Sequence, residues 1–262
     1  MKILFIGDIV GRAGREAVRK RVPVWVKERQ VDAVIANGEN AAGGSGITAA
    51  TAEELFRAGV HVITLGDHTW DQRELPQYIE KETRMLRPAN YPEGVPGRGW
   101  GVFEVSGFCP PVGVLNLQGR TFMNPVDDPF RVASELMPLL KEETPVVFVD
   151  FHAEATSEKI AMGRFLDGKA SAVVGTHTHV QTADEQIFPG GTAFLCDVGF
   201  TGPHESVIGR RIEPVLKRFL TGMPQRFEVA SEDIRFSAVL VTIDKQTGKS
   251  TGIERIFEKL ES

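Results

Sequence analysis

Acidic and imidazole side chains recur in this sequence at points where apolar, strand-like runs come to an end. Because ligands of α/β proteins bind just beyond the carboxyl ends of parallel strands, these side chains could share one edge of a sheet. Carboxylate and imidazole donors without cysteine suit Mn, Fe or Zn better than a thiolate site or an all-oxygen calcium site. The residues in question are Asp8, Glu39, Asn40, Asp67, His68, His152, His177 and His179.

Several of these residues also have an ordinary structural interpretation. Asp8 could cap a helix that begins near Arg12, and Asp71 with Glu74 has the spacing of a capping box. A lone His152 would more often be a hydrogen-bonded core histidine than a ligand. His177 and His179 lie two residues apart, so their rings point to one side of an extended chain. The joint occurrence of all the donors at predicted strand ends favours a metal centre.

The first third of the chain alternates between strand, turn and helix. Apolar runs at Lys2–Ile6, Ala33–Ala36 and Val60–Leu65 are separated by two helical patterns. We expect one helix from about Arg12 to Arg29, kinked or restarted at Pro23, and a second over Thr51–Ala58. Thr51 and Glu54 would form the capping box of the second helix, which Gly59 would end. This alternation predicts parallel βαβ units with right-handed crossovers.

After about Pro88 the pattern favours antiparallel pairing, and then alternates again. Together the elements predict two packed sheets with helices outside. No internal repeat or low-complexity linker is present, so we expect a single domain over residues 1–262. The expected strands lie at Gly101–Val105, Val112–Leu117, Val146–Phe151, Ala170–Gly175, Thr192–Cys196, Phe236–Ile243 and Thr251–Phe257, and the expected helices at Phe130–Lys141, Ser157–Leu166 and near Ile208–Leu220.

Composition and charge exclude several classes of protein. With 42% apolar and 25% charged residues, the 262-residue chain is neither disordered nor collagen-like, and it can bury enough surface to fold without a metal. A net charge of −5 disfavours duplex nucleic acid, and no apolar run is long enough to span a membrane or to form a signal peptide. Cys109 and Cys196 lack metal-site or disulfide spacing, which favours a reducing cytoplasm.

Five ordered blocks resemble the calcineurin-like metallophosphoesterases, and more narrowly their YmdB branch, whose members hydrolyse cyclic nucleotides. The blocks are NGENAAGG (37–44), GDHTWD (66–71), LQGRTFM (117–123), DFHAEATSEK (150–159) and GTHTHVQTADE (175–185). The resemblance covers essentially the whole chain. It implies a two-sheet mixed α/β sandwich flanked by helices, which agrees with the elements expected above.

The resemblance further implies two transition-metal ions per chain, Fe or Mn being favoured and Zn being an alternative. Glu39 would bridge the two ions. One ion would be completed by Asp8, Asn40 and His179, and the other by Asp67, His152 and His177. A hydroxide between the ions would attack the phosphorus in line, and His68 would donate a proton to the leaving oxygen.

Two positions depart from the broader family pattern. Most calcineurin-like enzymes have a histidine two residues after the first aspartate, where this chain has Val10; the YmdB branch generally shares that loss. The branch has asparagine where this chain has Asp67, which would add a full negative charge beside the second ion. We expect metal binding to survive this change, whereas Lewis acidity could fall.

Other polar and aromatic residues are weaker candidates. His61 lies in an apolar run and is expected to pack in the core, and His204 is expected on a surface loop, with a mobile lip over the site as the alternative. The loop Gly43–Gly46 lacks the lysine and hydroxyl residue of a phosphate-binding P-loop. Arg12 or Arg120 could steer an anion, although each is equally well explained as a solvated charge. Trp70 or Phe122 could stack on a base, although each could equally well pack within the fold.

These observations predict a dinuclear-metal phosphodiesterase that hydrolyses cyclic nucleotides, the 2′,3′-cyclic class being favoured by resemblance. One alternative is a phosphomonoesterase or nucleotidase. A second alternative is a weakly active regulatory protein that binds a nucleotide or a protein partner. The expected partner is a small phosphodiester, with a homo-oligomer as a further expectation.

Overall fold

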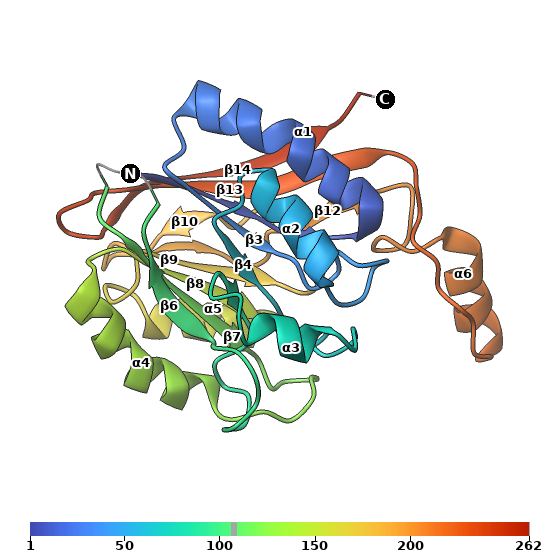
Figure 1. Cartoon of the computed structure of the whole chain (residues 1–262), viewed down its shortest axis with the longest axis horizontal. Helices are drawn as coiled ribbons and strands as arrows, with labels where there is room; N and C mark the ends of the chain where they lie inside the picture. Colours follow the sequence, from blue (N-terminus) through green and yellow to red (C-terminus); the bar gives the residue numbers. More distant parts are fainter. Residues whose placement is uncertain (106–108, 262) are drawn as a thin grey trace.

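A computed structural model describes residues 1–105 and 109–261, and over this part the chain forms six helices and fourteen strands in two sheets (Figure 1). The larger sheet has the order β2-β12-β13-β1-β3-β4-β5, with β14 paired to β13. Its strands are β1 (Lys2–Ile6), β2 (Asp8–Ile9), β3 (Ala33–Asn37), β4 (Val62–Thr64), β5 (Met85–Leu86), β12 (Phe200–Pro203), β13 (Ile234–Ile243) and β14 (Ser250–Lys259).

The smaller sheet has the order β10-β11-β9-β8-β7-β6 and supplies the other half of the sandwich. The strands β7, β8, β9 and β11 run parallel, while β6 and β10 pair antiparallel at its two edges. Its strands are β6 (Trp100–Phe103), β7 (Val112–Gln118), β8 (Val147–His152), β9 (Ala172–Thr176), β10 (Gln186–Ile187) and β11 (Ala193–Leu195).

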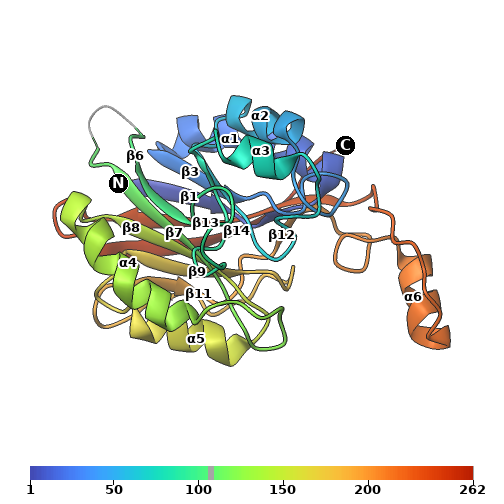
Figure 2. The same ribbon diagram turned by 60° about the horizontal axis from the view of Figure 1, so that its bottom comes forward.

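The helices form the outer layers of the sandwich, which Figure 2 shows from its side. The helices α1 (Gly11–Arg29), α2 (Ala49–Arg57) and α3 (Leu75–Ile79) lie on the side of the larger sheet, and α4 (Pro129–Glu143) and α5 (Thr156–Phe165) cover the smaller one. The helix α6 (Ile212–Thr221) stands away from both sheets in both views. The expected fold class, a two-sheet mixed α/β sandwich flanked by helices, is confirmed.

The side chains of β1 alternate between the two cores that lie on either face of the larger sheet. Leu4 and Ile6 belong to the core beneath α1 and α2, whereas Ile3 and Phe5 belong to the core between the two sheets. The ring of Phe5 stacks on Phe148 of β8, with centroids 5.4 Å apart. Since successive side chains of a strand point to opposite faces, β1 can be apolar throughout and still join two cores.

Three details of the helices differ from what the sequence suggests. Of the two alternatives for Pro23, a restart does not occur: the helix α1 runs through Pro23 as one element, and Pro23 is exposed, so its missing N–H falls on the solvent side. The N-cap of α2 is Thr48, whose hydroxyl accepts from the Thr51 N–H in a capping box with Thr51, so Thr51 and Glu54 do not form the box. Asp8 does not cap α1, since Val10 occupies that N-cap without a side-chain bond.

Candidate metal centre

The strands bring all eight candidate residues to one edge of the sandwich. In the larger sheet, β1, β3 and β4 are parallel neighbours, so the segments that follow them meet at their carboxyl ends. In the smaller sheet, β8 and β9 are likewise parallel, and His152 is the last residue of β8. The larger sheet thus contributes Asp8, Glu39, Asn40, Asp67 and His68, and the smaller sheet contributes His152, His177 and His179.

Four of these side chains form a tight cluster. One ligand atom from each of Glu39, Asp67, His152 and His177 lies within 4.8 Å of the others. The His152 Nε2 atom is 2.9 Å from the Asp67 Oδ1 atom and 3.2 Å from the Glu39 Oε1 atom. The His177 Nδ1 atom is 3.3 Å from the Asp67 Oδ1 atom. Two carboxylates and two imidazoles that converge in this way form a donor set suited to a divalent transition metal.

Three further donors lie beside this cluster. The His179 Nε2 atom is 3.3 Å from the Asn40 Nδ2 atom and 3.8 Å from the Asp8 Oδ1 atom. Asp8 is fully buried, and within the described residues its Oδ1 atom has no hydrogen-bond partner. Burial raises the pKa of the Asp8 carboxyl above its ordinary value, and the neighbouring His179 and His152 act in the opposite direction. A cation at this position would satisfy the orphaned oxygen, so the residues present fit a metal ion.

Glu39 touches members of both donor sets. Its Oε1 atom lies 3.2 Å from His152 Nε2 and accepts a hydrogen bond of 3.2 Å from Asn40 Nδ2. Its Oε2 atom accepts from the backbone N–H of His68 at 3.0 Å. Burial opposes the charge of Glu39, yet His152 beside it lowers the pKa of the Glu39 carboxyl. An ionised carboxylate therefore lies between the two groups of donors.

The ring of His152 is oriented by a buried hydroxyl. Its Nδ1 atom lies 2.9 Å from the Thr176 Oγ1 atom, and Thr176 donates to the Asp150 carboxylate at 2.8 Å. Asp150 also accepts from Thr64 and from Asn37, at 2.5 and 3.2 Å. Burial raises the pKa of Asp150 to about 6. Because the Thr176 proton points to Asp150, the Thr176 oxygen accepts the Nδ1–H of His152, whose Nε2 lone pair then faces the cluster.

The rings of His177 and His179 are oriented by acceptors on their outer sides. His177 Nε2 is 3.2 Å from the Glu154 carboxylate, so its Nδ1 lone pair faces Asp67. His179 Nδ1 donates to the Ile208 carbonyl at 3.0 Å, so its Nε2 lone pair faces Asp8 and Asn40. In each ring, the nitrogen that could bind a metal is thus the nitrogen that faces the carboxylates.

A buried ion pair holds the loop that carries these two histidines. Both histidines have left-handed backbones, with φ of 105° at His177 and 66° at His179. The Asp197 carboxylate accepts from the N–H and the hydroxyl of Thr178, which lies between them, at 3.1 and 2.7 Å. Lys159 in turn donates to Asp197 at 2.6 Å, and both side chains are buried. This pair fixes a backbone conformation that residues other than glycine adopt only at a cost.

His68 lies at the mouth of the site, and its partner is Asp71. The His68 Nδ1 atom is 2.8 Å from the Asp71 Oδ2 atom, which also accepts a short hydrogen bond from the Ser45 hydroxyl. The expected capping box of Asp71 with Glu74 is therefore wrong, since Glu74 is the N-cap of α3 and Asp71 bonds to His68 instead. Burial opposes protonation of His68, but Glu39, Asp67 and Asp71 outweigh it and raise the pKa of His68.

The remaining histidines and arginines lie apart from the cluster. His61 accepts the Val34 N–H at 3.0 Å, which agrees with a packing role. His204 stacks on Phe200, with centroids 4.1 Å apart, and Phe200 stacks on His179, so His204 supports the site from behind rather than forming a plain surface loop. Arg12 pairs with Glu16 and Arg120 with Asp128.

The two exposed aromatic residues, Trp70 and Phe122, are not among the metal donors. Trp70 is tilted against Tyr91, and Phe122 is almost fully exposed. Sequence reasoning missed Asp71, Asp150, Thr176, Lys159 and Asp197 as contributors to the site. Asp150, Lys159, Asp71 and Thr176 lie inside the quoted blocks, but none of them has a local signal that would separate it from its neighbours.

Substitution of Gly66 by alanine should weaken metal binding while the chain still folds. A Cβ atom at this position would collide with the His152 ring and with the Glu39 carboxylate, and neither group can move without leaving the cluster. We expect affinity for Mn²⁺ to fall by at least about 10–100-fold, the loss typical of disturbed ligand orientation. Isothermal titration with Mn²⁺ measures this effect.

The control for that experiment is Gly94→Ala, at a position with φ of +81° and open space around the added methyl group. It should lose about 1–2 kcal/mol of stability for its left-handed backbone and keep its metal affinity. Equal affinity in Gly66→Ala and the unmodified protein would contradict the placement of His152 and Glu39.

Comparison with known proteins places the chain among phosphoesterases. The family model described as "YmdB-like protein" matches residues 4–256. The chain is 50% identical over 257 residues, covering 98% of itself and 97% of the relative, to the 2′,3′-cyclic-nucleotide 2′-phosphodiesterase of Bacillus subtilis (strain 168).

Solved structures show the same architecture. A hypothetical protein of Thermus thermophilus is 43% identical with a TM-score of 0.92, and 99% of each chain is covered. A novel phosphatase of Mycoplasma pneumoniae is 36% identical, also with a TM-score of 0.92, covering 99% of this chain and 93% of that one. The 5′-nucleotidase of Candida albicans SC5314 is 12% identical with a TM-score of 0.59, covering 98% of this chain and 50% of that one, and shares the fold alone.

Proposed function

Because the chain belongs to the YmdB-like protein family, we propose that it is a dinuclear-metal phosphodiesterase that hydrolyses cyclic nucleotides, with the 2′,3′-cyclic class as its preferred substrates. The observation that carries this proposal is the convergence of carboxylates and imidazoles from both sheets on one site, which includes a buried Asp8 oxygen without a partner among the described residues. The 50% identity to a phosphodiesterase with this substrate class supports the choice of substrate.

Seven side chains would hold the ions. Glu39, Asp67, His152 and His177 form the donor set of one ion, and Asp8, Asn40 and His179 would hold the other with Glu39 shared between them. When bound, two such ions bind phosphate oxygens and lower the pKa of a water held beside the phosphorus. The donors contain no thiolate, which favours Fe or Mn and admits Zn.

His68 would complete the reaction as the proton donor. Cleavage of a ribose phosphodiester leaves an alkoxide on the sugar, which is a poor leaving group until it receives a proton. Asp71 accepts the Nδ1–H of His68, so the Nε2 atom of a protonated ring is left to deliver its proton to the leaving oxygen. Glu39, Asp67 and Asp71 raise the pKa of His68, and Asp71, which is not a metal donor, would continue to hold the Nδ1–H of the ring when the ions are bound.

Two measurements test the proposal. Metal analysis of the purified protein should find two transition-metal ions per chain. With those ions, the protein should hydrolyse a 2′,3′-cyclic nucleotide to the monophosphate and should cleave bis-p-nitrophenyl phosphate faster than p-nitrophenyl phosphate. Faster cleavage of the monoester would favour the phosphomonoesterase or nucleotidase. Saturable nucleotide binding without metal-dependent product would favour the regulatory protein.

Substitution of Asp67 by asparagine should keep both ions and raise turnover. Burial favours the neutral form of Asp67, but the neighbouring His152 and His177 outweigh it and lower the pKa of Asp67, so a full negative charge lies beside the expected position of the phosphate. An asparagine would remove that charge, strengthening the Lewis acid and reducing repulsion of the anionic substrate. We expect turnover to rise roughly 2- to 10-fold, which corresponds to a decrease of about 0.4–1.4 kcal/mol in the activation free energy.

The measurement is phosphodiesterase turnover at saturating Mn²⁺, because an amide holds a divalent ion less tightly than a carboxylate does. The exposed Asp127→Asn provides a charge-matched control and should leave turnover unchanged. No gain in Asp67→Asn under these conditions would show that the carboxylate has another catalytic role, or that Asp67 is not a ligand.

The proposal extends to the domain organisation, the partner and the location of the protein. We propose one metallophosphoesterase domain over residues 1–262, with a small phosphodiester rather than a duplex nucleic acid as its partner. No helix within the described residues is long and apolar enough to cross a membrane. Cys109 and Cys196 are free thiols, which favours a reducing location such as the cytoplasm.

A further inference from the structure

The segment that follows β7 forms a surface loop whose two ends are joined by one buried residue. Asn90 is fully buried, and its side-chain amide donates to the carbonyls of Gln118 and Asp127, both at 2.8 Å. Its side-chain oxygen accepts from the Gln118 N–H at 2.8 Å, and its own carbonyl accepts from the Asp127 N–H at 2.9 Å. Residues 119–126, here called the β7 loop, thus form a closed surface loop of a kind that is frequently functional.

The β7 loop is also held along its length. The Glu158 carboxylate accepts from the backbone N–H groups of Arg120 and Thr121, at 3.0 and 3.1 Å. Gly119 lies so close to the segment after β8 that a Cβ atom there would be 2.6 Å from the Cβ atom of Ala153. The loop therefore has a defined conformation, and it loses little conformational entropy when a ligand binds to it.

Both ends of the β7 loop contact segments that carry metal donors. At one end, the Gly119 N–H donates to the His152 carbonyl at 2.9 Å. At the other end, Tyr91, which follows the buried asparagine, donates its hydroxyl to the carbonyl of Gly66 at 2.9 Å. Gly66 precedes Asp67, and both Asp67 and His152 belong to the four-residue donor cluster. The loop thus borders the expected position of the substrate phosphate.

Phe122, near the middle of the β7 loop, presents its ring to solvent. Its side chain is 89% exposed, whereas the next residue, Met123, packs against the core beneath α4 and α5. The backbone of Phe122 is left-handed, with φ of 64°, which bulky residues adopt only at an energetic cost. Neither packing nor backbone preference explains a phenylalanine here, and strained residues of this kind cluster at ligand sites.

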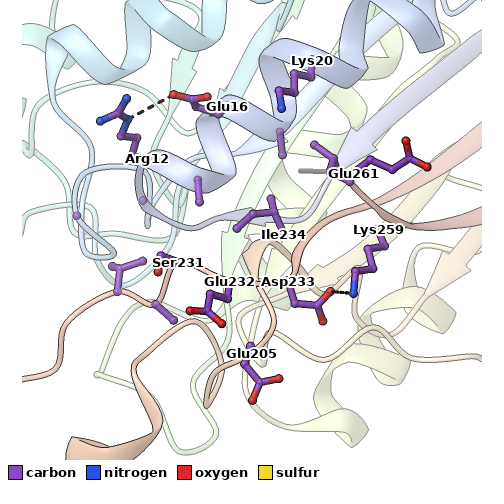
Figure 3. A pocket seen from close by; sticks show the side chains of 17 residues that line it. Arg12, Glu16, Lys20, Glu205, Ser231, Glu232, Asp233, Ile234, Lys259 and Glu261 are labelled. Carbon is purple, nitrogen blue, oxygen red and sulfur yellow. Dashed lines mark hydrogen bonds and ion pairs between the residues drawn. The ribbon is translucent and has the colours of Figure 1, made fainter.

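A separate cleft offers no comparable surface for a base. The cleft has a volume of about 1350 Å³ and lies beside the first turns of α1 and the end of β14 (Figure 3). Its charged residues include the ion pairs of Arg12 with Glu16 and of Lys259 with Asp233. Among the described residues that line it there is neither an aromatic side chain nor any of the eight candidate metal-site residues.

We propose that the β7 loop is the base subsite of the protein, in which Phe122 stacks on the nucleobase while the phosphate lies at the metal centre. This inference rests on the proposed function, because it assigns the base of the proposed nucleotide substrate. Trp70 is the less suitable ring, since it is only 36% exposed and packs against Tyr91 with centroids 6.1 Å apart. Every base has a π-face, so the subsite accepts all four bases and favours the larger purines.

Steady-state kinetics of the Mn²⁺-loaded protein test the role of the ring. The two substrates are adenosine 2′,3′-cyclic phosphate and methyl riboside 2′,3′-cyclic phosphate, which lacks a base. Phe122→Gly should raise KM for the adenosine substrate about 5- to 150-fold with kcat retained, the range expected for loss of one base–aromatic stack. KM for the base-free substrate should not change. Phe122→Trp should keep the low KM, and Leu139→Ala, on the exposed side of α4, is the control.

Thermal unfolding separates recognition of the base from a structural role of the ring. Phe122→Gly should melt no lower than the unmodified protein, because glycine adopts a left-handed backbone without steric cost and the exposed ring has little packing to lose. A lower melting temperature together with unchanged nucleotide binding would make Phe122 a structural residue and would overturn the proposal.

Binding of adenosine 3′-monophosphate to the Mn²⁺-loaded protein, measured by isothermal titration, distinguishes this proposal from the proposed function. Weaker binding by Phe122→Gly in a protein without turnover would support the base subsite and contradict the phosphodiesterase. Turnover with the same KM and the same affinity in Phe122→Gly would support the phosphodiesterase and overturn the base subsite. A loss of affinity in Trp70→Ala but not in Phe122→Gly would assign the base to Trp70 instead.

Discussion

Replacement of Glu39 by alanine should empty both metal positions. The carboxylate lies between the two donor sets, within 3.2 Å of the His152 Nε2 and Asn40 Nδ2 atoms. Its loss would remove one ligand from each ion and the negative charge that screens the two cations from each other. Because bound ions supply several kcal/mol of transition-state stabilisation, turnover should fall by at least about 10³-fold.

Metal content after gel filtration, measured by plasma emission, checks this expectation directly. Glu39→Gln keeps the shape of the side chain and separates the effect of charge from that of packing. Glu93→Ala, in an exposed loop, is the control and should retain both ions. A Glu39→Ala protein that still holds nearly two ions per chain would exclude the bridging position.

Replacement of His68 by alanine should leave both ions bound and still lower turnover about 10²–10⁴-fold, the usual contribution of a general acid. The loss should depend on the leaving group. An alkyl or ribose oxygen needs a proton to depart, whereas p-nitrophenolate does not. The deficit should therefore be large for a 2′,3′-cyclic nucleotide and much smaller for bis-p-nitrophenyl phosphate.

Asp71→Asn provides an internal comparison, because Asp71 holds the Nδ1 side of the His68 ring. Asp71→Asn should lose less turnover than His68→Ala, and its loss should depend on the leaving group in the same way. Glu74→Gln lies three residues further along and contacts the N–H of Ala49 instead, so it should have no such effect. An equal loss of activity on both kinds of substrate would mean that His68 binds a phosphate oxygen rather than protonating the leaving group.

The positions of the candidate metal donors could be predicted because they depend on a general property of parallel sheets. Asp8, Glu39 and Asp67 follow three apolar runs, and three parallel neighbouring strands necessarily end at one edge. Within a strand, alternation such as that of Ile3 and Leu4 reveals two buried faces. These signals are local or periodic, so a single sequence contains them.

Other features depend on the local backbone and surroundings that only the folded chain supplies. Asp71 and Glu74 have the spacing of a capping box, but the carboxylate of Asp71 finds a stronger partner in His68, which the turn after β4 brings to it. Thr48 rather than Thr51 caps α2, because the preceding loop supplies the extended backbone one turn earlier. Pro23 is tolerated within α1 because it faces solvent. A periodic sequence pattern does not show which of two nearby residues will form a cap or a hydrogen bond in the folded structure.

The order of strands in the larger sheet has a consequence for how the protein is made. β1 lies between β3, which follows it after one helix, and β13, which is synthesised more than two hundred residues later. Once the ribosome has passed His179, every metal donor has been synthesised, yet one side of β1 still has no partner. The larger sheet, on which Asp8, Glu39 and Asp67 depend, can close only after β13 emerges. The strands that carry these donors therefore lack their full sheet until β13 has been made, and the nascent chain depends until then on whatever protects an open sheet edge from aggregation.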